Sequence, residues 1–157
     1  MHQTAFKTPL IDQTQIRQLI PHADAMCLLE SVTAWDERSI HCLTTTHRDP
    51  ANPLRRQDRL PAVMAFEYGG QAAAIHGGLR ARAAGWTAVP GYLAALRDAR
   101  CFVTNLDEIT EPLEVVAELL LGDRADCIYA IQINAAGRPV AEARLSILPQ
   151  PAAGAIS

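Results

Sequence analysis

The sequence lacks the features that mark several large classes of protein. Its four cysteines are widely spaced, so they form neither a CxxC redox pair nor a paired zinc-ligand pattern. No apolar run approaches the ~18–20 residues of a membrane span, and the amino terminus lacks the basic and apolar segments of a secretory leader. We therefore expect reduced, mostly packed thiols, no metal or cofactor, and a cytoplasmic protein.

Strong positive charge is also absent. The formal net charge of −3 argues against a nucleic-acid-binding protein, whose surface would be strongly basic. A length of 157 residues with 49% hydrophobic residues indicates one globular domain, which we place at 1–150. The tail, 151–157, is small and has nothing to bury, so we expect it to be disordered.

The patterns that are present alternate between strands and helices. Asp12 is expected to cap a short helix over 13–20, which Pro21 ends. Residues 27–47 contain two β-prone runs around the polar "WDER", which is typical of a hairpin. Later β-prone runs separated by turn signals predict a long strand and then an antiparallel meander: "YLAALRDARCFV", "LEVVAELLLG", "DCIYAIQIN" and "PVAEARLSILP".

The longest helical candidate is "RLPAVMAFEYGGQAAAIHGGLRARAAG", with Pro61 in its first turn. One face combines large and tiny residues, which would let the helix backbone lie close against a curved sheet; its members are Val63, Phe66, Gly70, Ala73, Ala74 and Gly77. The order of strands, one long helix and further strands predicts an α+β protein. In the hot-dog fold, such a helix fills a wrapped antiparallel sheet, and we predict that architecture.

Three segments carry a resemblance to a known family. "LIPHADAMCLLESV" and "LPAVMAFEYGGQAA" resemble two motifs of hot-dog 3-hydroxyacyl-acyl-carrier-protein dehydratases, and "GYLAALRDARCFVTNLDEITEPLEVVAELL" resembles their third strand and following turn. The similarity spans roughly Ile16 to Leu148. "EYGGQAAAIHGGLRAR" looks especially like a divergent branch from aryl-polyene pigment biosynthesis clusters.

The resemblance assigns Glu67 and Gln71 to the family's acidic residue and glutamine. It implies that the helix face of Glu67 looks into a substrate tunnel, where exclusion of water would keep a proton available for donation. The reaction implied is loss of water from a 3-hydroxyacyl thioester. Ala62 and Val63 would supply N–H groups to the thioester oxygen, because Pro61 has none.

The family's catalytic histidine is absent from its usual position. Counting back from Glu67 by the family's spacing reaches Pro53. "DPANPLR" is similar to the D-x-N-P-x-H motif of related enoyl hydratases, but Arg55 stands where their histidine would be. We predict that Asn52 and Arg55 contact substrate. An arginine patch is expected either to meet an acidic carrier protein or a phosphopantetheine phosphate, or to be an ordinary solvated surface; its members are Arg55, Arg56 and Arg59, with Arg80, Arg82, Arg97 and Arg100 as additions to the same side.

Two other histidines are candidates for the missing base. His47 lies at a strand end that enters this loop, and His22 matches a family position that mostly makes structural hydrogen bonds. His76 should point away from Glu67, because nine residues turn a helix about half a turn beyond two full turns. His41 lies in the middle of a strand, where a core or cross-strand role is the better interpretation.

Three hypotheses follow. The first is a dehydratase-like enzyme that acts on a carrier-bound 3-hydroxyacyl chain, with Glu67 as acid or shared acid–base. The second is a hot-dog thioesterase in which Glu67 activates water. The third is a catalytically weak subunit that completes a partner dehydratase, since family sites combine residues of two chains. In every case we expect a homodimer, or a heterodimer with another hot-dog protein, whose interface includes the strand "YLAALRDARCFV".

Overall fold

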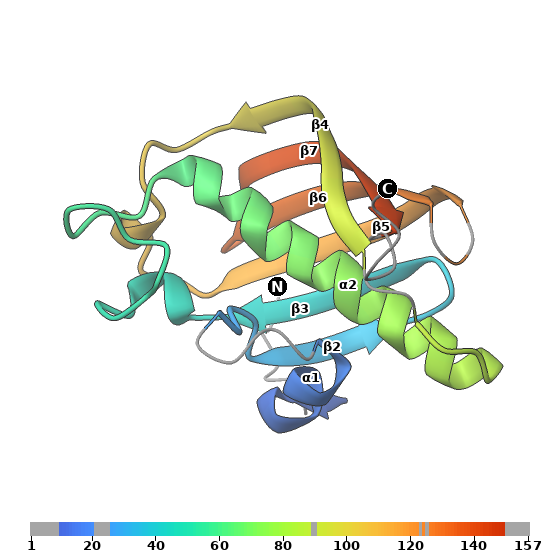
Figure 1. The fold of residues 1–157 in the computed structure, drawn as a ribbon. Coiled ribbons are helices and arrows are strands. Elements are labelled where there is room, and N and C mark those ends of the chain that lie inside the picture. The colour runs from blue at the N-terminus through green and yellow to red at the C-terminus, as the bar shows by residue number, and fades with distance from the viewer. Residues whose placement is uncertain (1–9, 21–25, 89–90, 123, 125, 150–157) are drawn as a thin grey trace, which may run out of the picture.

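The structure is a computed structural model that describes residues 10–20, 26–88, 91–122, 124 and 126–149. One antiparallel sheet wraps around a long helix (Figure 1). Its strand order is β1-β2-β3-β5-β6-β7-β4, from β1 (Ile11–Asp12), β2 (Ser31–Trp35), β3 (Ser39–Thr44), β5 (Leu113–Gly122), β6 (Cys127–Ala135), β7 (Arg138–Pro149) and β4 (Gly91–Cys101). The predicted hot-dog fold is therefore confirmed, and so are the hairpin and the meander.

The short first helix, α1 (Gln13–Leu19), begins as the sequence predicts. The Asp12 side chain accepts a hydrogen bond from Gln15 N–H at 3.0 Å, and the Gln15 side chain accepts one from Asp12 N–H at 3.0 Å. This reciprocal pair satisfies two amide donors at the helix start. The helix buries Ile16 in the core. The proposed tail, 151–157, lies outside the described residues.

The long helix, α2 (Ala65–Ala84), follows a 3-10 turn, η2 (Ala62–Met64), and ends at Gly85 in the left-handed conformation. Its predicted sheet-facing side is only partly right. Phe66 and Ala73 are buried, whereas Ala74 is exposed and Gly70 has open space around it. The contact that requires glycine is at Gly69, where a Cβ would lie 2.4 Å from the Ile131 side chain.

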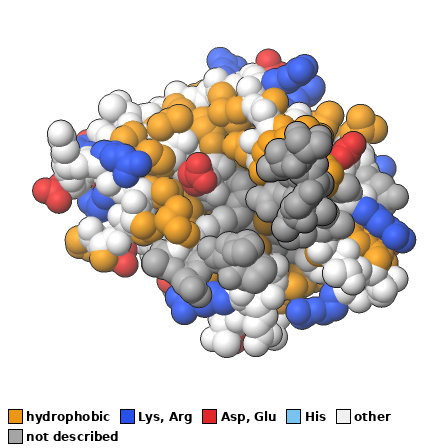
Figure 2. All heavy atoms as spheres, viewed as in Figure 1, with side chains coloured by type: hydrophobic (Ala, Val, Ile, Leu, Met, Phe, Trp, Pro, Cys, Tyr) orange, Lys and Arg blue, Asp and Glu red, His pale blue; other side chains and the backbone are white. Residues whose placement is uncertain are grey.

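The glycine that faces the sheet is thus Gly69 and not the predicted Gly70, and this difference of one residue has a physical cause. The helix is covered on more than one side, because the sheet packs on Gly69 and Leu19 of α1 packs on Gly78. The buried sector is therefore wider and rotated compared with the face read from residue size alone. Among the described residues nothing covers the opposite side of α2 and of the η2 turn before it, where Val63, Glu67 and Ala74 are all exposed. Figure 2 shows this side of the molecule, on which hydrophobic side chains form several patches and the visible Lys and Arg side chains lie mostly toward the rim.

Strand β4 forms a free edge of the sheet. It is eleven residues long, pairs with β7 on one side, and is exposed along nearly its whole length. Tyr92, Leu93 and Leu96 are 45%, 44% and 38% exposed. Long exposed edges with apolar side chains invite pairing with another strand, so this geometry agrees with the interface expected for the "YLAALRDARCFV" segment.

The cysteines and the helices can be examined within the described part of the chain, because free thiols and no membrane span are expected. All four cysteines are free thiols there, with Cys27 and Cys42 buried and Cys101 exposed. Burial raises the pKa of the Cys42 thiol to about 12. Neither described helix combines the length and apolar character that crossing a bilayer requires.

Candidate active site

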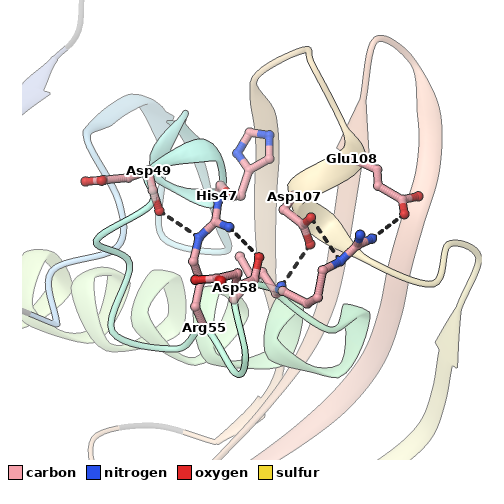
Figure 3. Close-up of polar contacts among 8 residues, drawn as sticks. His47, Asp49, Arg55, Asp58, Asp107 and Glu108 are labelled. Carbon is pink, nitrogen blue, oxygen red and sulfur yellow. Dashed lines mark hydrogen bonds and ion pairs between the residues drawn. The ribbon is translucent and has the colours of Figure 1, made fainter.

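The candidate site lies where the loop between β3 and α2 meets the start of α2. This loop is tied to a second loop that contains the 3-10 turn η3 (Leu106–Glu108) (Figure 3). Arg59 forms ion pairs with Asp107, at 3.3 Å, and with Glu108, while Leu60 N–H donates to the Asp107 carboxylate at 2.8 Å. Burial pushes the pKa of Asp107 upward, but the Leu60 hydrogen bond and the Arg59 charge hold it below its usual value. The two loops therefore form one unit.

Arg55 braces the interior of the first loop (Figure 3). Its guanidinium donates to the backbone oxygens of Asp49 at 2.8 Å, Asp58 at 2.9 Å and His47 at 3.4 Å. These bonds use three of the five N–H donors of the guanidinium. The structure thus gives Arg55 a loop-closing role, and its predicted contact with substrate stays a prediction.

His47 lies in a short 3-10 turn, η1 (Thr46–Arg48), and is fully buried. Its Nε2 is 3.0 Å from the backbone oxygen of Ile109, so this nitrogen carries the proton when the ring is neutral. Burial lowers the pKa of His47, which favours the neutral ring. Nδ1 has no hydrogen-bond partner among the described residues. The ring connects the two loops, and its predicted role as base is untested.

Asn52 connects the same loop to α2. Its side-chain amide donates to Thr46 O at 2.8 Å and to the Tyr68 hydroxyl at 3.0 Å, and its oxygen accepts from Leu54 N–H at 2.8 Å. The Tyr68 hydroxyl also lies 2.9 Å from Thr46 Oγ1. Burial raises the pKa of Tyr68. Asn52 is 6% exposed, so the structure places this predicted substrate contact inside a buried hydrogen-bond network.

Gln71 fixes the segment that crosses α2. Its side-chain oxygen accepts from Leu28 N–H at 2.9 Å, and its amide nitrogen donates to Met26 O. The carbonyl of Leu28 accepts from Thr44 and Thr46 hydroxyls at 2.6 and 2.7 Å. Gln71 therefore holds residues 26–28 over the helix, one turn after Glu67. His22, the other candidate base, lies outside the described residues.

Glu67 differs from its neighbours in having no such bond. It lies in the first turn of α2 on the open side, and it forms no hydrogen bond or ion pair with any described residue. His76, in contrast, is buried on the inner side of α2, with Nδ1 2.8 Å from the Tyr129 hydroxyl and Nε2 2.7 Å from Asp36 O. The predicted separation of His76 from Glu67 is confirmed. Glu67 is the carboxylate that remains available for a ligand.

The two predicted amide donors at the helix start are not equivalent. Ala62 N–H already donates to Thr104 O at 3.0 Å, so it is not free to bind a thioester oxygen in this conformation. Val63 is 56% exposed on the same open side as Glu67. Its N–H is therefore the remaining candidate donor, and that role stays a prediction.

An open depression of about 340 Å³ lies beside the η1 turn, lined by Glu30, Thr45, Thr46, Arg48 and Asp49. This lining is polar and does not include Glu67, so the depression does not suit an acyl chain. The described residues contain no cluster of three or more side chains that could hold a metal ion.

Sequence reasoning missed the tie between Arg59 and Asp107 and the buried hydroxyl of Tyr68. No local pattern marks either one, because the partners are far apart in sequence. Tyr68 offered a weak signal, since a buried tyrosine hydroxyl usually needs a partner.

Comparisons with known proteins agree with the fold of this chain. The sequence model of the ApeP-like family, described as ApeP dehydratase, matches residues 14–156. The solved dehydratase heterocomplex ApeI:P from Xenorhabdus doucetiae contains a chain that is 26% identical, with a TM-score of 0.79; the match covers 88% of this chain and 92% of that one. No curated protein sequence matches this chain.

More distant structures share the fold alone. A putative thioesterase from Shewanella oneidensis is 14% identical with a TM-score of 0.61, covering 88% of this chain and 97% of that one. Zebra fish thioesterase superfamily member 2 is 13% identical with a TM-score of 0.61, covering 89% and 99%. Such identities do not transfer a reaction from one protein to another.

Proposed function

We propose that this chain, which belongs to the ApeP-like dehydratase family, removes water from a 3-hydroxyacyl chain carried as a thioester on an acyl carrier protein. The observation that carries the proposal is the exposed carboxylate of Glu67 in the first turn of α2, which has no hydrogen-bond or ion-pair partner among the described residues. Among the described residues, the side chains of Asn52, Arg55 and Gln71 are instead bonded to backbone or buried groups. The substrate would therefore meet Glu67 first.

In the proposed reaction, a base removes the proton next to the thioester carbonyl. Negative charge then develops on the carbonyl oxygen, and the proposed donor that stabilises it is the Val63 N–H in the turn before α2. Glu67 protonates the departing 3-hydroxyl group, which leaves as water, and a carbon–carbon double bond forms. Glu67 ends the step as a carboxylate and must regain a proton before the next turnover.

The base is proposed to come from a second hot-dog chain. No histidine lies between His47 and His76 in the sequence, and both rings are buried with backbone or tyrosine partners. The related Xenorhabdus doucetiae structure is a heterocomplex of dehydratase chains. The free edge of β4 offers this chain a surface for such a partner, because strand pairing there would extend the sheet.

Reconstitution tests the proposal. The chain is purified alone and together with a candidate second dehydratase, and each preparation is incubated with a 3-hydroxyacyl carrier protein. Mass spectrometry should show loss of one water in the mixture, at a rate far above either chain alone. The matched variants are Glu67→Gln and Glu37→Gln, because Glu37 is an exposed glutamate in the turn between β2 and β3.

Three results would count against the proposal. Dehydration that is unchanged by Glu67→Gln would remove Glu67 from the chemistry. Full activity of the isolated chain would show that no partner base is needed. Release of free thiol from simple acyl thioesters, with no loss of water, would identify a thioesterase instead.

A further inference from the structure

The outer face of the sheet, on the side away from α2, has an unusual distribution of residues. Directly opposite residues in an antiparallel pair project to the same face. One continuous row on the outer face consists of Ser39, Glu118, Ala130, Arg144 and Arg97. The neighbouring row, which faces the helix, includes Ile40, Ala117 and Ile131, all 2% exposed or less. Because exposed and buried rows alternate along the strands, this pattern identifies the side chains that lie on the outer face of the sheet.

Part of this outer face is apolar. Leu121 pairs with Ile128 across β5 and β6, and Leu148 pairs with Tyr92 across β7 and β4. Leu121 is 67% exposed, Leu148 is 38% exposed and Tyr92 is 45% exposed. The solvated face of an antiparallel sheet is normally polar, so apolar residues here indicate a contact surface.

The charges on the outer face are separated by strand. β5 carries the exposed carboxylates Glu114 and Glu118, whereas Arg144 on β7 lies directly opposite Arg97 on β4. Within the described residues, the ion pair on this face is Arg100 with Glu142 at 3.7 Å, and none reaches Glu118, Arg144 or Arg97. Two like charges in directly opposite positions destabilise a sheet unless an anion lies near them. This face therefore has unpaired charges of both signs.

We propose that this outer face binds the same face of a second copy of the chain, with a two-fold axis that runs along β6. Strands lie about 4.8 Å apart, so β5 and β7 are equally far from β6 on its two sides. The rotation therefore places Glu118 of each copy against Arg144 of the other. The small Ala130 lies at the centre of the row, where the two sheets approach most closely.

A second copy fits this face better than an acidic partner protein does. An acidic surface would meet Arg97 and Arg144, but it would also meet Glu114 and Glu118 on the same face. A two-fold contact uses both signs, because the same patch occurs twice in opposite orientation. The contact is also separate from the free edge of β4, so both can form in one assembly. Two edge-paired units joined in this way contain four chains.

Charge reversal tests the contact independently of catalysis. The chain, with whichever partner it retains, is examined by light scattering in about 0.1 M salt, where surface charges still act over ~10 Å. The wild type should give particles of four subunits. Glu118→Arg and Arg144→Glu should each halve the particle mass, because each places like charges together. The double variant Glu118→Arg/Arg144→Glu should restore the mass, since it reverses each pair.

The matched control is Glu37→Arg, which makes the same charge change in the exposed turn between β2 and β3. It should leave the mass unchanged. All of these positions are at the surface, and thermal unfolding of each variant shows whether its fold is retained. A monomeric wild type, single variants that keep the wild-type mass, or a double variant that stays at half mass would each overturn the proposal. Loss of dehydration without a change in mass would bear on the proposed reaction alone.

Discussion

The loop before α2 and the open side of α2 lie next to each other but differ in how their polar groups are used. In the loop, Arg55, Asn52 and His47 are bonded to backbone or buried groups. On the open side of α2, Glu67 has no partner among the described residues. The difference shows that residues with similar chemistry can be divided by their bonds into those that hold the site together and those that are free to act.

The largest expected effect on stability comes from breaking the loop network. Asn52→Ala removes the side-chain bonds to Thr46 O, the Tyr68 hydroxyl and Leu54 N–H, and leaves the hydroxyl only its contact with Thr46 Oγ1. Because a buried group without a partner costs about 1–3 kcal/mol, the loss should be about 2–4 kcal/mol. Urea unfolding measures it. Tyr68→Phe, which removes one hydroxyl, should cost about 1 kcal/mol; equal losses for the two variants would contradict the network.

The two adjacent glycines of α2 differ in their surroundings, so alanine substitutions at each one test which side of the helix faces the sheet. Gly69→Ala places a methyl group against Ile131, and overpacking of this kind typically costs about 1–3 kcal/mol. Gly70→Ala meets open space in the described structure, so the isolated chain should gain up to about 1 kcal/mol in helix propensity. Thermal unfolding of both variants gives the sign of each change. A stabilising Gly69→Ala would show that the helix is rotated from the position described here.

Acidification should weaken the fold through its buried histidines. Burial lowers the pKa of His47 and of His76 in the folded chain, so the unfolded chain binds more protons as pH falls below about 6.5. The neutral rings therefore make their full contribution to the free energy of unfolding above that pH, and this contribution is lost as pH falls.

This pH effect can be measured by thermal unfolding between about pH 7.5 and 5, which lies above the range where aspartates usually titrate. The melting temperature should fall across this window. His76→Gln should reduce the fall, because one titrating ring is removed. A melting temperature that rises on acidification would contradict the neutral, buried assignment.

The smallest effect on stability is expected from breaking the Arg59 ion pairs that connect the two loops. The Arg59 side chain is 48% exposed, and ion pairs of exposed side chains contribute about 0–1 kcal/mol. Arg59→Gln should therefore lower stability by less than about 1 kcal/mol, and added salt should weaken the difference. A loss as large as that of Asn52→Ala would mean that the ion pairs, and not the buried amide, hold the loop.

Much of the fold was predictable because local rules agree with the final structure. The Asp12 cap, the hairpin around "WDER" and the turns between β5, β6 and β7 follow from short-range sequence patterns. The inner side of α2 was misjudged by one residue, because the position of Gly69 depends on Ile131 in a distant strand. The two-residue strand β1 was also missed, since its pairing with Val32 and Ser31 leaves no periodic signal.

The site was predictable mainly where a residue acts alone. Glu67 needs only its place at the start of α2, which the resemblance gave. The uses of Asn52, Arg55 and Gln71 depend on which backbone groups the folded loop brings within reach. Residue type alone does not contain that information. Sequence analysis therefore named the candidate residues but not their bonds.

The most direct test of the account is the turnover rate of the reconstituted pair with Glu67→Gln in this chain. Because a positioned acid is lost, Glu67→Gln should decrease kcat by about 10²–10⁴-fold. The free energy of unfolding should change by less than about 0.5 kcal/mol. Glu37→Gln should leave both quantities at the wild-type value. A Glu67→Gln pair that dehydrates the 3-hydroxyacyl carrier as fast as the wild type would contradict the central claim.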